Sequence, residues 1–147
     1  MADLTDKIVM VTGAAGAIGA AIVAAVKNAG GTAIASDLAG RPGTNHALDV
    51  TDEGDWQRVT AEIGKNHGRL DGLVNAAGIA SVGHVEKSDF ADWRRVLSVN
   101  LDGTFLGCKY GFPLLRKQGG AIVNLSSVLG LIGSANLPAY SASKGGV

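Results

Sequence analysis

The sequence lacks several features that would define its class. It has one cysteine, Cys108, so no disulfide can form within the chain, which fits a reducing cytosol. Its 13 basic and 13 acidic residues balance, so no excess of one charge indicates nucleic acid or an anionic membrane as a partner. No apolar run reaches membrane-spanning length, and residues 1–6 have no basic, apolar signal pattern. We therefore expect a cytoplasmic protein with no membrane partner.

Metal-ligand spacing is also missing. The three histidines, His46, His67 and His84, are far apart in the sequence, so we predict no metal site. The chain has no internal repeat and no low-complexity linker. Its 147 residues, 46% of them hydrophobic, can bury a core despite 22 glycines, and we expect a single domain over residues 1–147.

A glycine-rich turn follows the first apolar run. Residues 7–12 are β-branched and apolar, as in a strand buried on both faces, and Gly13, Gly16 and Gly19 follow before an Ala-rich helix that ends near Ala29. Glycines at such a turn let the backbone approach a pyrophosphate, whose charge then meets free N–H groups at the helix N-terminus. Glycines also serve plain tight turns, but the strand and helix on either side favour a dinucleotide site.

The rest of the chain alternates between short apolar runs and helical patterns. In the first helix Ile18, Ile22 and Val26 recur at four-residue steps and predict an apolar stripe against the sheet. This alternation predicts an α/β domain with a doubly wound, Rossmann-like parallel sheet in the strand order 3-2-1-4-5. The expected strands are residues 7–12, 32–36, 45–48, 70–74 and 121–125; the expected helices lie at about 16–29, 52–65, 89–117 and from 138.

Asp37 stands at the end of the second predicted strand. An acid about twenty residues beyond the glycines is where the ribose 2′-OH of NAD would be held, and its charge would repel a 2′-phosphate. Ala14, Ala15 and Leu38 offer no compensating cation, so we predict NAD over NADP. The alternative is that Asp37 only caps a turn or helix.

Two further segments carry small or polar residues in apolar surroundings. Asn75-Ala76-Ala77-Gly78 ends the fourth predicted strand, and its small side chains would let a flat ligand lie against the backbone, unless they serve only tight sheet packing. Asn100 lies within an apolar helical register. If it is buried it needs partners, either as a structural hydrogen-bonding group or as part of the site.

The C-terminal stretch combines hydroxyls with a lysine. Residues 121–125 read as a buried strand that delivers Ser126 and Ser127 to its C-terminal end. Tyr140 and Lys144 follow on a predicted helix at i and i+4, one turn apart on the same face. An ammonium beside a phenol favours the phenolate, and a nearby hydroxyl can polarise an oxygen, so these residues form a plausible acid/base site. The alternative is a solvated Tyr–Lys pair.

Taken together and in this order, these segments resemble the short-chain dehydrogenase/reductase family over the whole chain. Asp49-Val50 adds to the match, and Ser127 lies thirteen residues before Tyr140, as in the shorter, single-domain branch. The resemblance implies hydride transfer between NAD and a secondary alcohol or ketone. It also implies a homodimer or homotetramer that acts on a small-molecule substrate.

The resemblance assigns roles residue by residue. Tyr140 becomes the general acid/base, Lys144 favours its phenolate and holds the nicotinamide ribose, and Ser127 polarises the substrate oxygen. Asn100 helps to hold a water-linked proton relay to Lys144. The implied cofactor-binding residues are Gly13, Gly16, Ile18 and Gly19 at the pyrophosphate turn, Asp37 at the adenosine ribose, Asp49 and Val50 at the adenine, Asn75, Ala76, Ala77 and Gly78 at the centre, and Tyr140 and Lys144.

Two departures from the family pattern leave alternatives open. Ala17 stands where the shorter branch usually has glycine, and glycines at 13, 16 and 19 match the spacing of the extended branch of epimerases and dehydratases. Family members also continue with further strands after Tyr140, so we expect residues 1–147 to be the N-terminal portion of an enzyme. Without those strands, residues 121–125 would form an exposed apolar edge, and a helix of about eight residues could not hold Tyr140 and Lys144 rigid. A non-catalytic dinucleotide-binding module or partner subunit is therefore a second hypothesis.

Overall fold

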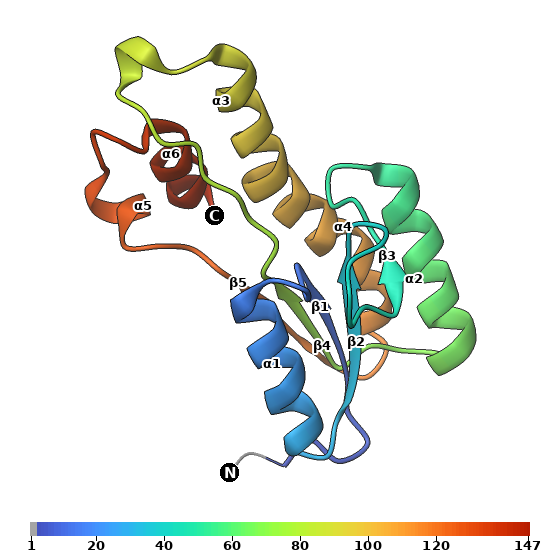
Figure 1. The fold of residues 1–147 in the computed structure, drawn as a ribbon. Helices are drawn as coiled ribbons and strands as arrows, with labels where there is room; N and C mark the ends of the chain where they lie inside the picture. Colours follow the sequence, from blue (N-terminus) through green and yellow to red (C-terminus); the bar gives the residue numbers. More distant parts are fainter. Residues whose placement is uncertain (1–2) are drawn as a thin grey trace.

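A five-stranded parallel sheet forms the centre of the molecule (Figure 1). The structure is a computed structural model that describes residues 3–147; Met1 and Ala2, the start of the segment considered for a signal peptide, lie outside it. The strand order is β3-β2-β1-β4-β5, as predicted: β2 and β3 are added on one side of β1, and the chain then crosses back to add β4 and β5 on the other side. The strands are β1 (Ile8–Thr12), β2 (Thr32–Asp37), β3 (His46–Ala47), β4 (Gly72–Asn75) and β5 (Ala121–Asn124).

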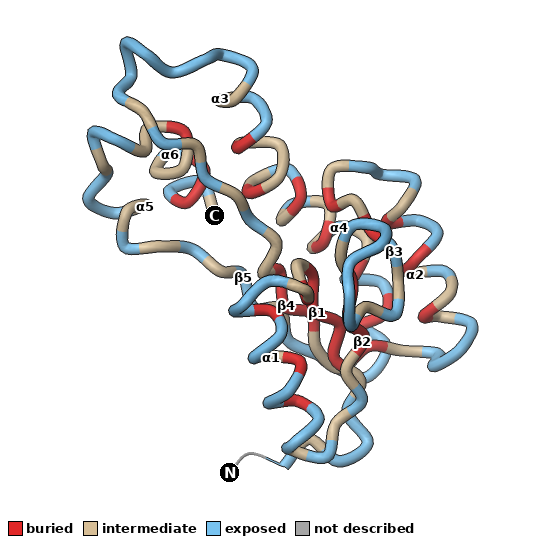
Figure 2. The backbone as a smooth tube through the Cα atoms, in the orientation of Figure 1, coloured by how far each residue is buried: buried red, intermediate tan, exposed pale blue. Residues whose placement is uncertain are grey.

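Helices cover both faces of the sheet. On one face α1 (Ala17–Asn28) buries Val23 and Val26 against Val9 and Val11 of β1. The other face carries α2 (Glu53–His67) and α4 (Gly103–Leu115), and its buried side chains are Met10, Ile34, Leu48, Val50, Trp56, Val59, Ile63, Leu70, Leu73, Leu114 and Leu115. Figure 2 shows the buried residues concentrated in the strands and in the helix faces that meet them.

The apolar stripe of α1 differs from the predicted one. Its buried residues are Gly19, Val23 and Val26, with Ile22 partly buried, whereas Ile18 is 62% exposed. The prediction that Ile18 packs on the sheet was wrong, because the first helical turn lies at the mouth of a cleft instead of over a strand. An exposed isoleucine at that place is available to a ligand.

The long helical stretch is continuous through Asn100. It runs from α3 (Phe90–Leu97), capped by the Asp89 carboxylate, through a π-helical turn, η2 (Ser98–Asp102), into α4. Pro113 does not end α4, which continues to Leu115. A π-turn inserts one extra residue into a helix and often lies at a functional site. Here it turns the Asn100 side chain into a fully buried position.

Helix α4 approaches the sheet closely because three glycines line its inner face. A Cβ atom on Gly107 would lie 2.2 Å from Oδ1 of Asn75, and one on Gly111 would lie 2.7 Å from a Leu73 methyl. Gly103 meets Val50 in the same way, at 2.9 Å. Helix glycines cost stability by themselves, so this spacing reflects packing and not helix propensity.

The C-terminal segment extends past the carboxyl ends of the strands. It contains α5 (Leu129–Ile132) and α6 (Pro138–Gly146), which contact each other, and α6 also packs on α3 (Figure 1). A short 3₁₀ turn, η1 (Val85–Lys87), precedes α3. β5 is the edge strand, with Val123 52% exposed, so the sequence-based reading of a buried strand was wrong and the expected exposed edge is observed. No helix within residues 3–147 is long and apolar enough to cross a membrane.

A buried carboxylate joins the amino ends of the two central strands. Asp71 accepts hydrogen bonds from the Ile8 N–H at 3.0 Å and from Arg69 Nε at 3.1 Å, and Lys7 Nζ lies 3.6 Å away. Burial alone would raise the pKa of Asp71, but the hydrogen bonds from Ile8 and Arg69 and the charges of Arg69 and Lys7 outweigh it and lower that pKa.

We expect Asp71→Ala to lower the free energy of unfolding by about 2–3 kcal/mol, because the Ile8 N–H and Arg69 lose a charged acceptor. The stabilisation by the Asp71 carboxylate is complete at pH values above about 3.9, the pKa of an aspartate in the unfolded chain. It is lost as the pH falls through the lower pKa that Asp71 has in the folded protein. Urea unfolding at several pH values measures both effects. Asp92→Ala is the control: its pair with Arg95 is exposed at 45% and 56%, so a much smaller loss than in Asp71→Ala is expected. Equal losses in the two variants would contradict the prediction.

Candidate active site

A cleft of about 800 Å³ opens where the strand order reverses between β1 and β4. Ligands of doubly wound sheets bind at this switch point, beyond the carboxyl ends of the strands. The lining residues come from the glycine turn, from the ends of β2 and β4, from the segment after β3, and from α3 and η2. They are Gly13, Ala15, Gly16, Ala17, Ile18, Gly19, Asp37, Leu38, Arg41, Leu48, Asp49, Val50, Thr51, Ala76, Ala77, Gly78, Ile79, Arg95, Ser98 and Val99.

The glycine turn is shaped by two close backbone approaches. Gly13 has a φ of 63°, and a Cβ there would lie 2.7 Å from the Ala77 backbone. A Cβ on Gly19 would lie 2.2 Å from the Gly13 carbonyl oxygen. Ala17, the departure from the shorter-branch pattern, is the exposed first residue of α1, so its methyl group is accommodated. No side chain caps α1 and its first turn has no acid, which leaves N–H groups for an anion.

Asp37 is both a turn cap and a cleft residue. Its Oδ2 accepts from the Ala15 N–H at 2.9 Å and its Oδ1 accepts from the Leu38 N–H at 2.8 Å, which ties β2 to the glycine turn. The two sequence-based alternatives for Asp37 are thus compatible. The cleft also contains Arg41, a cation that was not predicted at the site. It follows Asp37 by four residues, in a turn without the periodicity that would have indicated which way its side chain faces.

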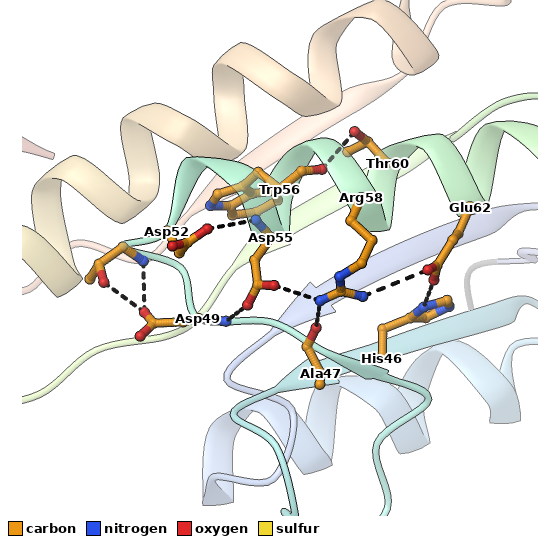
Figure 3. A network of polar contacts seen from close by, with 10 residues as sticks. His46, Ala47, Asp49, Asp52, Asp55, Trp56, Arg58, Thr60 and Glu62 are labelled. Carbon is orange, nitrogen blue, oxygen red and sulfur yellow. Dashed lines mark hydrogen bonds and ion pairs between the residues drawn. The ribbon is translucent and has the colours of Figure 1, made fainter.

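Asp49 and Val50 line the opposite side of the cleft and are held by a polar network (Figure 3). The Asp49 carboxylate accepts from Thr51 N at 2.9 Å and from Thr51 Oγ1 at 2.7 Å, and the Asp49 N–H donates to Asp55 at 2.9 Å. That N–H and the Arg58 guanidinium lower the pKa of Asp55. The network gives this cleft wall a fixed shape.

Residues at the end of β4 face either the cleft or the neighbouring strand β5. Ala76, Ala77 and Gly78 line the cleft, and the Ala76 and Ala77 N–H groups donate to Thr12 Oγ1 at 3.1 and 3.2 Å. The Asn75 side chain is outside the cleft lining and donates to Asn124 Oδ1 of β5 at 2.8 Å. Asn75 therefore joins two strands, and the structure does not bring this predicted cofactor-binding residue into the cleft lining.

Lys144 brings the acid/base helix to the cleft. The residue is 7% exposed, and its Nζ donates to the Leu125 carbonyl at 2.5 Å and lies 5.8 Å from the ring centroid of Tyr140. A Cβ on Gly78 would lie 3.7 Å from this Nζ, so the ammonium is adjacent to a cleft-lining residue. Burial lowers the pKa of Lys144. The alternative of a solvated Tyr–Lys pair does not fit this burial.

Ser127 and Asn100 differ in how they are held. Ser127 Oγ accepts from the Leu129 N–H at 3.2 Å, which leaves its own proton free to donate. Asn100 is fully buried; its Oδ1 accepts from Ile79 N at 2.8 Å and its Nδ2 donates to Ile79 O at 2.9 Å. No hydrogen bond between Ser127 and Tyr140 is found among residues 3–147. The structure thus joins Asn100, Gly78 and Lys144 closely and leaves Ser127 to its local turn.

Short α6 is held by contacts and not by its length. Ser126 Oγ donates to the Lys144 carbonyl at 2.6 Å, and Ser143 Oγ is bonded to Asn100. A Cβ on Gly130 of α5 would lie 2.6 Å from the same Lys144 carbonyl. These contacts supplement the short helix, which has only nine residues of its own to hold Tyr140 and Lys144. Within residues 3–147, no three His, Cys, Asp or Glu side chains are grouped as a metal would require.

A Rossmann-like parallel sheet with a glycine turn at its switch point is the architecture in which dinucleotides bind beyond the carboxyl ends of the strands. Residues 7–147 match the family model for short chain dehydrogenase, so the chain belongs to the short-chain dehydrogenase/reductase family of oxidoreductases, which generally bind a nicotinamide dinucleotide.

Similar proteins agree with this membership. The trans-4-hydroxycyclohexanecarboxylate dehydrogenase of Sinomonas cyclohexanicum is 34% identical over 98% of this chain and 63% of its own length. The D-threitol dehydrogenase of Mycolicibacterium smegmatis is 39% identical over 98% of this chain and 61% of its own length. The crystal structure of gox2181 superposes with a TM-score of 0.91 at 30% identity, covering 98% of this chain and 63% of that one. The chain thus spans about three-fifths of the length of these relatives.

Proposed function

We propose that the chain is the cofactor-binding and acid/base portion of an NAD-dependent oxidoreductase that transfers a hydride between NAD and a secondary alcohol or ketone. The observation that carries the proposal is the placement of the Lys144 ammonium between the Tyr140 ring and the cleft-lining Gly78. The cleft, about 800 Å³, falls within the roughly 300–1,000 Å³ of ligand sites. Family membership and the relatives named as dehydrogenases support the same reaction class.

Each part of the cleft would bind a different group of the cofactor or substrate. The glycine turn would hold a pyrophosphate at the start of α1, Asp37 the adenosine ribose, and Lys144 the nicotinamide ribose. When bound, the nicotinamide supplies the hydride donor or acceptor. The Tyr140 phenol oxygen gives or takes the proton of the substrate hydroxyl, with the ammonium of Lys144 on the next turn of the same helix. Ser127, whose hydroxyl proton is free, would polarise the substrate oxygen.

Titration with NADH, followed by its fluorescence, tests the proposal first. We expect saturable binding, and NADH production in the presence of NAD and a panel of secondary alcohols. Failure to bind either NADH or NADPH would contradict the proposal. Binding without turnover on any alcohol would favour a second candidate, a non-catalytic dinucleotide-binding module or partner subunit.

The preference for NAD is part of the proposal and rests on Asp37. Its carboxylate is held by two backbone N–H groups, so it cannot turn away from a 2′-phosphate. We expect Asp37→Asn to shift the NADPH-to-NADH affinity ratio about tenfold or more toward NADPH, since roughly 1.4 kcal/mol of charge repulsion corresponds to tenfold. Arg41 would then be the cation available to the phosphate.

Asp49→Asn is the matched control for that experiment, because it removes the same charge from the other wall of the cleft. In Asp49→Asn the NADPH-to-NADH affinity ratio should change less than about twofold, because solvent and salt screen a charge that is distant from the 2′-phosphate. A ratio that shifts equally in both variants would show that Asp37 has no special role.

We further propose a homodimer or homotetramer that works in the cytoplasm. The support for association is an apolar face on α4, where Phe105 and Phe112 are 63% and 56% exposed. Analytical ultracentrifugation should find an assembly that Phe105→Glu dissociates. A monomer over the whole concentration range would contradict this proposal.

A further inference from the structure

The helix that carries Tyr140 and Lys144 has only nine residues, too few to be stable in isolation. Its position relative to the cleft therefore depends on contacts with neighbouring elements. One of these contacts comes from Ser143, which is fully buried and directly precedes Lys144. No role follows for Ser143 from the acid/base chemistry, because it is outside the cleft lining and its hydroxyl is bonded to the buried Asn100.

The Ser143 hydroxyl occupies the middle of a hydrogen-bond chain. Asn100 Nδ2 donates to Ser143 Oγ at 2.9 Å, and Ser143 Oγ donates to the Tyr140 carbonyl at 2.7 Å. On its other side Asn100 is bonded to both the N–H and the carbonyl of Ile79, at 2.8 and 2.9 Å. The chain thus joins the loop after β4, the π-turn η2 and helix α6.

This chain uses both amide protons of Asn100. One goes to the Ile79 carbonyl and the other to Ser143, so the side chain has a single orientation with every donor satisfied. Ile79 lies next to Gly78, and both line the cleft. The hydrogen bonds thereby fix the position of the helix of Tyr140 and Lys144 relative to the Gly78–Ile79 loop, which lines the proposed cofactor site. A buried, satisfied network of this kind specifies one geometry, because any other leaves a polar group unpaired.

We propose that Ser143 is a positioning residue, which locks the Tyr140–Lys144 helix to the cofactor-side loop through Asn100. The proposal rests on the function proposed above for Tyr140 and Lys144. Removal of the hydroxyl leaves an Asn100 N–H without an acceptor in a buried place and frees α6 to shift. The Lys144 ammonium then moves out of its contact with Leu125 and away from the nicotinamide ribose.

Ser143→Ala tests the proposal, with Ser141→Ala as its matched control. Ser141 lies on the same helix, and its buried hydroxyl has no hydrogen-bond partner among the described residues, so the same atom is removed without breaking a bond. We expect Ser143→Ala to weaken NADH binding roughly tenfold, as loss of a buried hydrogen bond does. The NMR titration of ¹³C-labelled Lys144 should move toward the ordinary lysine value. Ser141→Ala should change neither the NADH affinity nor the Lys144 titration. Ser143→Thr keeps the hydroxyl and should retain both.

Unchanged NADH affinity and an unchanged Lys144 titration in folded Ser143→Ala would overturn the proposal. So would equal changes in Ser141→Ala, since these would report only a loosened helix. If Ser143→Ala does not fold, Ser143→Cys is used instead, because it keeps a side chain of similar volume with a weaker hydrogen-bonding group. The expected changes in NADH affinity and in the Lys144 titration are the same. If the unaltered chain binds no dinucleotide, the proposed function fails, while the Lys144 titration still decides the role of Ser143.

Discussion

Replacement of Tyr140 with phenylalanine is expected to remove turnover while the fold and cofactor binding are retained. Phenylalanine keeps the ring that lies 5.8 Å from Lys144 Nζ and removes only the hydroxyl that exchanges the proton. General acid/base groups contribute about 10²–10⁴-fold to rate, so kcat should fall by at least about a hundredfold. The measurement is NAD-linked alcohol oxidation, with NADH affinity determined on the same preparation.

Tyr110→Phe is the control, since Tyr110 is the other of the two tyrosines in the chain. Its hydroxyl donates to Glu53 at 2.6 Å between α2 and α4, and neither residue lines the cleft. It should leave kcat within about twofold, as an exposed surface contact contributes little. Full turnover by Tyr140→Phe would end the acid/base assignment, even if the dinucleotide bound normally.

The second large effect is expected at Gly19. An added Cβ would lie 2.2 Å from the Gly13 carbonyl oxygen and 2.8 Å from the Ala14 Cα, and both are backbone atoms that cannot rotate away. Gly19→Ala must therefore push α1 from the glycine turn and change the direction of its N-terminal N–H groups. We expect NADH affinity to fall by more than about a hundredfold and the free energy of unfolding by about 1–3 kcal/mol, as in other overpacked sites.

Gly16→Ala separates this steric effect from a general effect of adding a methyl group to the turn. A Cβ on Gly16 would lie 3.3 Å from the same Gly13 oxygen, a contact that a small adjustment relieves. NADH titration and urea unfolding of both variants provide the comparison, and Gly16→Ala should lose less than about tenfold in affinity. Similar binding by Gly19→Ala and the unaltered chain would show that the turn does not hold the pyrophosphate.

The strength of the sequence in this protein lies in its local patterns. β-Branched runs, helical periodicity and the glycines at 13, 16 and 19 are properties of neighbouring residues, and they were sufficient for the strands, the parallel sheet and its order. The spacing of Tyr140 and Lys144 likewise follows from helix geometry alone. Family membership rests on these same segments, and the match to residues 7–147 confirmed it.

Only the tertiary structure decided which side chains contact one another, because these contacts join residues that are far apart in the sequence. The Asn100–Ser143 bond spans 43 positions and the Asn75–Asn124 bond spans 49. The exposure of Ile18, the arrival of Arg41 in the cleft and the close approach of Gly107 to Asn75 depend in the same way on how helices pack on the sheet. Periodicity identifies the buried face of an element, but packing determines the neighbour that the face meets.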